Sequence, residues 1–436
     1  TEKRDSFASR FGMIMTLIGV AVGLGNVWRF PYMAGMFGGG AFLVLYILIV
    51  ALFGVPALMA EYTLGRHTQR GPLGAFTKAG VPGGKFFGWL LFITVLMATS
   101  YYTVVIGWVL WYFIASITGA YAGQDTGKFF DATLGSFSIQ FITTAIIIVL
   151  IVVVLYYGIS KGVEKVSKIG MPLLYIMLLI LIIRSVTLPG AIEGLKFYLK
   201  PDFSKINWGT VMGAMGQAFF SLSLGGTFLM TYASYMSKDE DIPNAAVYTA
   251  IGDTGAAILA GFVVLPAVFA FGIKVTSGPP LTFITIPSIF AKIPGGMFFA
   301  ALFFLLLLFA AYLSDVAAFE VLVAALVDEF KWERKKALII FGLAELIIAI
   351  PSMLDLNFLL KNDVIWGSTM QPIGSAIVML SLAWFLGKDK AMGEINQGAN
   401  KPIGLWWYYW IKYVVPIGII LIVSMGLKDV IATFFK

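Results

Sequence analysis

The sequence contains no cysteine and a single histidine, His67, among its 436 residues. These absences exclude disulfides, cysteine nucleophiles and metal sites built on thiolates or several histidines. Charged residues are also scarce, at 12%, whereas 59% of the residues are hydrophobic and the mean hydropathy is +0.91. This balance is typical of a chain with many membrane spans. Because basic loops beside a membrane explain the net charge of +7, we expect no nucleic-acid partner.

About eleven hydrophobic stretches are long enough to cross the hydrocarbon core of a bilayer as helices. We therefore expect an all-α polytopic membrane protein embedded in the lipid bilayer. With the N-terminus in the cytoplasm, most of the 30 lysines and arginines face inside, which predicts a multi-pass protein of the cell membrane. The predicted spans are roughly 11–37, 41–65, 87–117, 138–157, 166–186, 211–236, 245–273, 296–327, 335–352, 364–387 and 405–434.

The first span has a composition that does not suit a continuous helix. Gly19, Gly23 and Gly25 alternate with apolar residues, and Asn26 and Arg29 follow them. Each helical glycine costs about 1 kcal/mol relative to alanine, and polar residues at membrane depth cost more. We expect a broken helix whose free carbonyls hold a small cation and whose free N–H groups face an anion, as in transporter binding sites. The alternative is a glycine-rich packing face for a neighbouring helix, which leaves the two polar residues unexplained.

A second span of this kind runs over residues 213–235. Its middle contains Gly216, Gln217, Ser221, Ser223, Gly225, Gly226 and Thr227. Interrupted helices at spans one and six predict two five-helix repeats, and an odd number of spans inverts the second repeat, which places a binding site between the breaks. The expected divisions are a cytoplasmic segment 1–10, a first repeat 11–186, an extracellular connection 187–210, a second repeat 211–387, and an eleventh helix with its flanking loop 388–436.

Several short motifs lie at matching positions of these spans. They are Val-Gly-Leu-Gly-Asn-Val-Trp-Arg-Phe-Pro-Tyr (22–32), Gly-Gly-Gly-Ala-Phe (38–42), Glu61 with Gly65 and Arg66, Gln-Ala-Phe-Phe-Ser-Leu-Ser-Leu-Gly (217–225) and Thr-Tyr-Ala-Ser-Tyr (231–235). In them, and nearly end to end, the chain resembles the neurotransmitter:sodium symporter family, in particular its bacterial amino-acid-transporting members. The resemblance implies sodium-coupled symport of L-α-amino acids into the cell by alternating access, no enzymatic activity and no organic cofactor.

The resemblance also implies positions for one or two sodium ions. The first site corresponds to the Ala21 carbonyl and the side chains of Asn26, Ser221 and Asp253. The second corresponds to the carbonyls of Gly19, Val22 and Ala310 and the hydroxyl of Ser314. Leu313 stands where the family has a side-chain oxygen, so the second site is one ligand short. The number of sodium ions therefore stays open.

By the same resemblance, the substrate carboxylate meets the N–H groups of Leu24 and Gly25 and the Tyr102 hydroxyl. The substrate ammonium meets carbonyls near Ala21, Phe220 and Ser221, and Phe220 covers the site from outside. The remaining implied roles are an outer gate of Arg29 and Asp363, an inner gate of Arg4 and Asp328 with Tyr235 nearby, bracing of the sixth span near Ser223 by Glu61, and substrate contacts of Ser223 and Ser314.

The substrate class follows from small residues at expected pocket positions. Monoamine-transporting relatives carry an acid at Gly23, so a glycine favours a substrate that brings its own carboxylate. Gly226 and Ala318 stand where the family has bulky residues, which predicts a wide pocket for bulky hydrophobic or aromatic amino acids. The alternative is that neighbours such as Thr227 or Met230 refill this space.

Two further interpretations concern the buried acids. Ala257 stands where chloride-dependent members have serine, so we hypothesise that the Asp253 carboxylate replaces chloride. The main rival function is a proton-coupled amino-acid transporter of the same fold, with Glu61, Asp253 or Asp315 as the proton carrier. An amino-acid receptor or a channel is less favoured. The basic run that includes Arg334 is interpreted as a solvated cytoplasmic loop, and the oligomeric state stays open.

Overall fold

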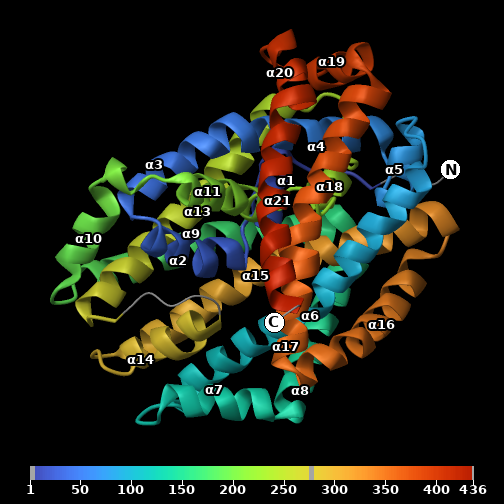
Figure 1. Ribbon diagram of the computed structural model, residues 1–436. Coiled ribbons are helices and arrows are strands. Elements are labelled where there is room, and N and C mark those ends of the chain that lie inside the picture. Colours follow the sequence, from blue (N-terminus) through green and yellow to red (C-terminus); the bar gives the residue numbers. More distant parts are fainter. Residues whose placement is uncertain (1–4, 274–278, 435–436) are drawn as a thin grey trace.

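The computed structural model describes residues 5–273 and 279–434, with side chains described up to Ser424. Within these ranges the chain is built from helices and contains no β-strand. Figure 1 shows the longer helices packed side by side, with α1, α6, α15 and α18 passing close to the middle of the molecule. The predicted all-α membrane fold is confirmed.

The first half of the chain ends at α9, before the connection at residues 187–210. Its helical segments are α1 (Arg10–Ala21), a π-helical turn (Gly25–Arg29), α2 (Phe30–Met36), α3 (Gly40–Ile49), a π-helical turn (Val50–Gly54), α4 (Val55–Thr68), α5 (Pro72–Lys78), α6 (Gly84–Thr118), α7 (Thr126–Gly135), α8 (Phe137–Tyr156), a π-helical turn (Ile159–Val163) and α9 (Glu164–Val186).

The second half begins within the connection at residues 187–210. Its segments are α10 (Ala191–Leu199), a 3₁₀ turn (Phe203–Lys205), α11 (Trp208–Ser221), α12 (Phe228–Ala233), α13 (Ile242–Ala270), a π-helical turn (Leu281–Thr285), α14 (Ile286–Phe290), α15 (Gly296–Phe330), α16 (Arg334–Leu354), α17 (Leu356–Asn362), a π-helical stretch (Asp363–Met370), α18 (Gln371–Leu380), a π-helical stretch (Ser381–Leu386), α19 (Lys388–Asn396), α20 (Leu405–Tyr409), a π-helical turn (Trp410–Val414) and α21 (Val415–Phe434).

The first predicted span is bent by 55° between α1 and the helical segment Gly25–Met36. Counting this pair as one, the described residues contain up to ten helices long and apolar enough to cross a membrane. The sixth predicted span is divided into α11 and α12, which are 14 and 6 residues long. Each half is too short to cross a bilayer alone, because about 20 helical residues are needed.

The break between α11 and α12 has an unusual backbone. Ser223 and Thr227 have positive φ angles of 52° and 56°, a conformation that non-glycine residues adopt rarely and at a cost. Asn207 and Thr210 form a reciprocal capping pair at the start of α11, which fixes where this half-helix begins. The two positive φ angles show that the residues between α11 and α12 interrupt the span and continue neither helix.

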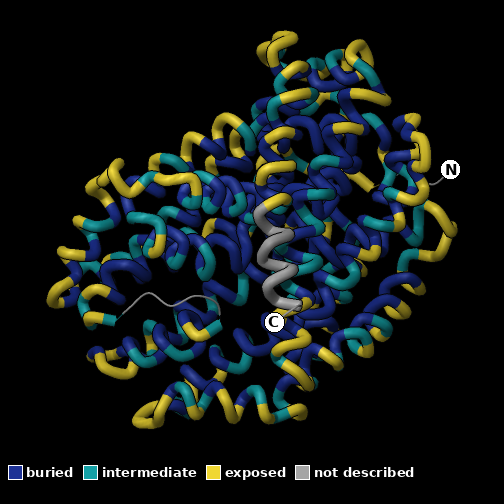
Figure 2. The backbone as a smooth tube through the Cα atoms, in the orientation of Figure 1, coloured by how far each residue is buried: buried dark blue, intermediate teal, exposed yellow. Residues whose placement is uncertain are grey.

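The surface and the interior differ in the way a membrane protein requires. Figure 2 shows buried residues in the centre of the molecule and exposed residues along the outer helices. Exposed residues on the outer helices include Ile142, Leu150, Ile176, Ile183 and Ile347, which suits contact with lipid. By contrast, the acids Glu61, Asp253, Asp315, Glu320 and Glu345 are buried inside. Intramembrane acids of this kind mark functional positions.

Candidate functional site

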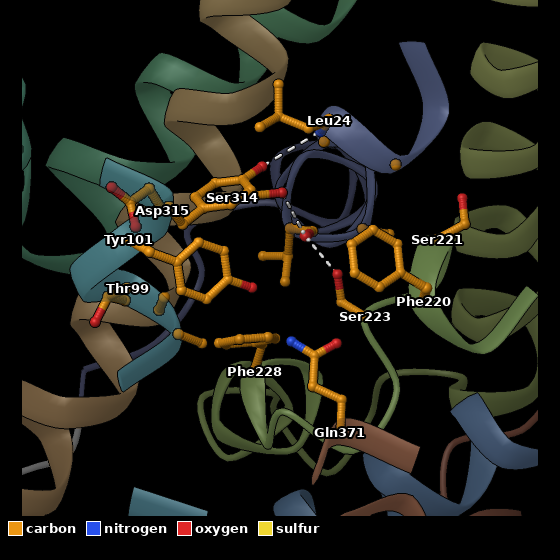
Figure 3. Close-up of a pocket in the computed structure, with 17 residues that line it drawn as sticks. Leu24, Thr99, Tyr101, Phe220, Ser221, Ser223, Phe228, Ser314, Asp315 and Gln371 are labelled. Atoms are coloured by element: carbon orange, nitrogen blue, oxygen red, sulfur yellow. Dashed lines mark hydrogen bonds between the residues drawn. The ribbon is translucent and has the colours of Figure 1, made fainter. Parts of the chain in front are cut away.

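A cavity of about 70 Å³ lies where the two broken helices face each other. Its wall comes from the breaks, from α6, α12 and α15, and from the first residue of α18 (Figure 3). The predicted substrate-contact residues that line it are Ala21, Gly23, Leu24, Gly25, Tyr102, Phe220, Ser221, Ser223, Ser314 and Ala318. The fold therefore brings together residues that are almost 300 positions apart.

The end of the cavity beside α1 presents hydrogen-bond donors. The Leu24 N–H points at the Tyr102 hydroxyl, with 3.3 Å between nitrogen and oxygen. Gly23 lies directly beside them, and an added Cβ there would lie 2.8 Å from Ser314 Oγ and 3.0 Å from the Tyr102 oxygen. There is consequently no room at Gly23 for a side chain. A backbone N–H at a helix break together with a phenol hydroxyl suits a carboxylate.

Asp253 lies on α13 beside the break in the first span and is fully buried. Its Oδ2 accepts a hydrogen bond from the Ser221 hydroxyl at 2.8 Å, and its Oδ1 accepts one from the Asn26 amide nitrogen at 2.6 Å. The ion pairs of the described residues do not include this carboxylate. A buried acid surrounded by neutral oxygens and an amide is suited to a small hard cation.

The Asn26 amide holds this group of residues together. Its nitrogen also donates to Ser221 Oγ at 3.0 Å, and its oxygen accepts from the Gly23 N–H at 2.9 Å. The side chain of Asn26, which the resemblance implies as a sodium ligand, therefore turns its oxygen to the α1 break and not to Asp253. The Asn26 oxygen can face Asp253 only if the amide turns over, so that its oxygen replaces its nitrogen.

The residues predicted for a second sodium site also lie close together. The Ser314 hydroxyl is 3.1 Å from the Val22 carbonyl and equally far from the Val20 carbonyl. Ala310 is buried one helical turn before Ser314. Leu313 packs against Gly19: a Cβ added to Gly19 would lie 3.2 Å from Leu313 Cδ1. An apolar group thus lies against the predicted cation position.

The expectation that Gly226 leaves open space is wrong. A Cβ on Gly226 would lie 2.1 Å from Cε2 of Phe228, and Phe228 lines the cavity whereas Gly226 does not. The refilling residue is neither Thr227 nor Met230. Because Thr227 has a left-handed backbone, the chain turns sharply and brings the next side chain back over Gly226.

A second, larger cavity of about 340 Å³ lies next to the first. Five residues line both cavities and form the partition between them, namely Leu24, Gly25, Tyr101, Tyr102 and Phe220. Arg29 and Asp363, the predicted outer gate, both line the larger cavity. Among the described ion pairs none joins these two: the Arg29 guanidinium lies 4.5 Å above the Phe220 ring, and Asp363 accepts from Tyr101 at 2.9 Å. The gate stays a prediction.

The opposite side of the molecule is closed by a different set of contacts. Tyr235 donates to Glu320 Oε1 at 2.5 Å, and Arg334 donates to Glu320 Oε2 at 2.6 Å. From the sequence, the basic run around Arg334 is interpreted as a solvated loop. Arg334 instead binds the buried carboxylate of Glu320. Asp328 accepts from the Gly71 N–H at 2.9 Å. Arg4, its predicted gate partner, lies outside the described residues.

Glu61 connects α4 to the break in the sixth span. Its Oε1 accepts a hydrogen bond from the Gly225 N–H at 2.7 Å. The carboxylate is fully buried. It supplies the hydrogen-bond acceptor for the Gly225 N–H that the interrupted helix does not supply. The geometry agrees with a bracing position for Glu61, although its contact is Gly225 and not Ser223.

Arg66, further along α4, is also fully buried and anchors the helix at the same end of the molecule as Glu320. It forms an ion pair with Glu394 of α19 at 2.7 Å and donates to the carbonyls of Glu240, Glu394 and Gln397. Lys238 reaches the same carboxylate at 2.7 Å. Burial alone would raise the pKa of Glu394, but these hydrogen bonds and charges hold it below its ordinary value.

Sequence reasoning missed several residues of this site. Phe228 and Gln371 line the inner cavity, and Glu320 with Arg334 closes the opposite side. Only Glu320 carried a usable signal, because an acid in the middle of an apolar span is costly. Asp315, one of the three predicted candidates for a proton carrier, lines the cavity, but its Oδ2 turns towards α6, where it accepts from Thr103 at 2.8 Å.

Comparison with known proteins gives consistent matches along the chain. The model of the sodium:neurotransmitter symporter family matches residues 4–132 and 130–435. The uncharacterized sodium-dependent transporter YhdH of Bacillus subtilis is 32% identical, with 97% of each chain covered. An uncharacterized sodium-dependent transporter of Haemophilus influenzae is 35% identical, with 97% of this chain and 98% of that one covered. The crystal structure of MhsT in complex with L-phenylalanine is similar with a TM-score of 0.87 and 37% identity, covering 97% of this chain and all of that one.

Proposed function

Because the chain belongs to the sodium:neurotransmitter symporter family and is a sodium-dependent membrane transporter, we propose that it carries L-α-amino acids into the cell together with sodium. The proposed location is the cell membrane, with the N-terminus in the cytoplasm. The observation that carries the proposal is the Asp253 carboxylate. It is buried beside both helix breaks with neutral partners, and it provides a negative charge for a cation beside the amino-acid cavity.

The residues around Asp253 fit sodium by their chemistry. Sodium is a hard cation that prefers oxygen ligands. This place offers the Asp253 carboxylate, the Ser221 hydroxyl and, after the amide turns, the Asn26 amide oxygen, and the family resemblance adds the Ala21 carbonyl. When bound, the ion supplies the positive charge that the buried carboxylate otherwise lacks. The turn of Asn26 also releases the Gly23 N–H, which the amide oxygen now occupies at 2.9 Å.

This arrangement suggests how ion and amino acid are coupled. The Gly23 N–H released by sodium lies next to the Leu24 N–H, which faces the Tyr102 hydroxyl. These two N–H groups and the hydroxyl are placed for the substrate carboxylate. Sodium binding therefore improves the anion site, and by reciprocity the amino acid improves the sodium site. Gly23 brings no charge of its own, which favours a zwitterionic substrate over a monoamine.

Alternating access is proposed to move the two breaks together. From outside, a substrate enters the larger cavity and passes the partition of Tyr101, Tyr102 and Phe220. Arg29 and Asp363 then close over the partition. On the cytoplasmic side, release requires the Tyr235–Glu320–Arg334 contacts to separate. Motion of spans one, two, six and seven against the rest of the molecule provides both changes.

We further propose that one strongly bound sodium is sufficient and that chloride is not needed. Leu313 puts a hydrocarbon group against the predicted second cation position, where a side-chain oxygen would be needed for tight binding. Ala257 offers no hydroxyl to a chloride ion. The Asp253 carboxylate provides the negative charge in place of chloride.

The test is uptake of labelled leucine, tyrosine and tryptophan into proteoliposomes that contain the purified chain. An inward sodium gradient, a potassium gradient and an imposed pH gradient are compared. We expect accumulation only with sodium, and loss of sodium affinity on Asn26→Ser but not on the exposed control Asn400→Ser. Uptake driven by protons without sodium would contradict the proposal and favour the proton-coupled rival. Binding without accumulation would indicate a receptor.

A further inference from the structure

One polar side chain of the inner cavity takes no part in the contacts described so far. Gln371 is the first residue of α18 and follows the π-helical stretch Asp363–Met370. Figure 3 shows its amide extending from α18 into the space between Phe228 and Ser223, away from the anion site at Leu24. Gln371 therefore faces the part of the cavity where the side chain of an amino acid would lie.

The polar neighbours of Gln371 already have hydrogen-bond partners. Ser223 donates to the Val20 carbonyl at 3.3 Å, and Tyr101 donates to Asp363 at 2.9 Å. Among the described residues, no side-chain hydrogen bond joins the Gln371 amide to another part of the protein. A carboxamide has two donors and an oxygen with two acceptor positions. These groups are thus available to a molecule inside the cavity.

The rest of this part of the cavity is apolar. Phe220 and Phe228 provide two aromatic walls, and Ala98 and Ala318 provide small ones. A ring placed between these walls gains contact area. If that ring carries no polar group, it displaces water from the Gln371 amide without replacing the hydrogen bonds, which weakens binding. A ring with a hydroxyl or an N–H group replaces them.

We propose that Gln371 is a specificity-determining residue that selects aromatic amino acids with a polar tip, tyrosine and tryptophan, over phenylalanine. The inference rests on the proposed amino-acid transport and deepens it by naming the substrate class. It assigns the two ends of the substrate to different elements. The helix breaks hold the zwitterion, and α18 reads the tip of the side chain through the carboxamide.

The test compares tyrosine and phenylalanine as competitors of labelled tryptophan uptake in proteoliposomes. A single neutral hydrogen bond corresponds to about a three- to tenfold difference in affinity, so the wild-type chain should bind tyrosine more tightly than phenylalanine by that factor. Gln371→Met keeps the length of the side chain and removes its hydrogen bonds. We expect it to remove the preference by weakening tyrosine while leaving or improving phenylalanine.

Gln124→Met is the matched control, because Gln124 is exposed and its amide donates to the Ala120 carbonyl. It should leave the preference unchanged. If Gln371→Met does not accumulate in the membrane, Gln371→Asn keeps the carboxamide on a shorter stem and should reduce the preference. Equal wild-type affinities, or an unchanged preference in the Gln371 variants, would overturn the inference. Absence of sodium-driven uptake of every amino acid in the wild type would instead contradict the proposed function.

Discussion

Replacement of Asp253 by asparagine removes the negative charge on which the proposed sodium site depends. The variant keeps the size of the side chain and one of its two oxygens. It can still accept one of the two hydrogen bonds that Asp253 accepts from Asn26 at 2.6 Å and Ser221 at 2.8 Å. We therefore expect the protein to fold and reach the membrane, and the loss to appear in sodium binding.

The magnitude follows from the Coulomb energy of the missing charge. Two unit charges 4 Å apart interact by about 4 kcal/mol at an effective dielectric constant of 20. The asparagine oxygen and water recover part of this energy, so we expect a net loss of about 2 kcal/mol or more. That corresponds to a rise of about thirtyfold or more in the sodium concentration for half-maximal uptake.

The assay is initial-rate uptake against sodium concentration, in chloride and in a chloride-free medium such as gluconate. Wild-type uptake should not depend on the anion. For Asp253→Asn we expect the sodium curve to shift to higher concentration, and chloride to restore part of the affinity. In the double variant Asp253→Asn with Ala257→Ser, the added hydroxyl offers chloride a hydrogen-bond donor, so the chloride effect should be larger.

Normal uptake by Asp253→Asn, with an unchanged sodium curve and no response to chloride, would refute this reasoning. Such a result would mean that the carboxylate is neutral in the working protein or lies too far from the ion to affect it. Asp125→Asn is a suitable control, because Asp125 caps α7 at an exposed position. It removes the same charge without approaching the cavity.

Three more predictions concern residues whose geometry is described above. Leu313→Thr places a hydroxyl against the second cation position, so we expect steeper sodium dependence with a Hill coefficient above one in the same uptake assay; an unchanged curve would argue against a latent second site. Gly23→Ala places a Cβ 2.8 Å from Ser314 Oγ and 3.0 Å from the Tyr102 oxygen, so amino-acid affinity measured by competition should fall about tenfold or more, which corresponds to about 1.4 kcal/mol, with normal protein levels. Glu394→Gln leaves the buried Arg66 without its carboxylate and should lower the unfolding free energy by about 3 kcal/mol. Because the pKa of Glu394 is lowered by folding, this stabilisation is present above its ordinary pKa and disappears as the pH falls through the lowered value. Thermal unfolding in detergent should therefore show the variant and wild type converging in acid and separated at neutral pH; a gap that persists in acid would contradict the role of the charge.

The sequence was sufficient for the membrane fold and for the position of both helix breaks. Long apolar runs specify helices in lipid, because a backbone there must satisfy its own hydrogen bonds. Glycines followed by Asn26, and Gly225 beside Gly226, are exceptions that such a segment does not tolerate without a reason. The interruption of these two spans was therefore predictable from energy alone.

The details that failed depend on backbone turns and side-chain rotation. Phe228 fills the space at Gly226 because Thr227 adopts a left-handed backbone, which spacing along a helix cannot predict. Gln371 reaches the cavity after eight residues of π-helix, so the usual rotation of 100° per residue from Asp363 gives the wrong face. The direction of the Asn26 amide depends on whether its oxygen faces the Gly23 N–H or Asp253.

The hydrogen bond between Glu61 and Gly225 has a mechanical consequence. It joins α4 to the break in the sixth span, and the packing of Gly65 directly against the Met230 carbonyl joins α4 to α12 as well. If α12 tilted alone, the buried Glu61 carboxylate and the Gly225 N–H would lose their hydrogen bond to each other. To keep that bond, α12 would carry α4 with it, so the smallest moving part of the proposed transport cycle is a pair of helices, and the hinge of this pair lies on the Phe220 side of Gly225.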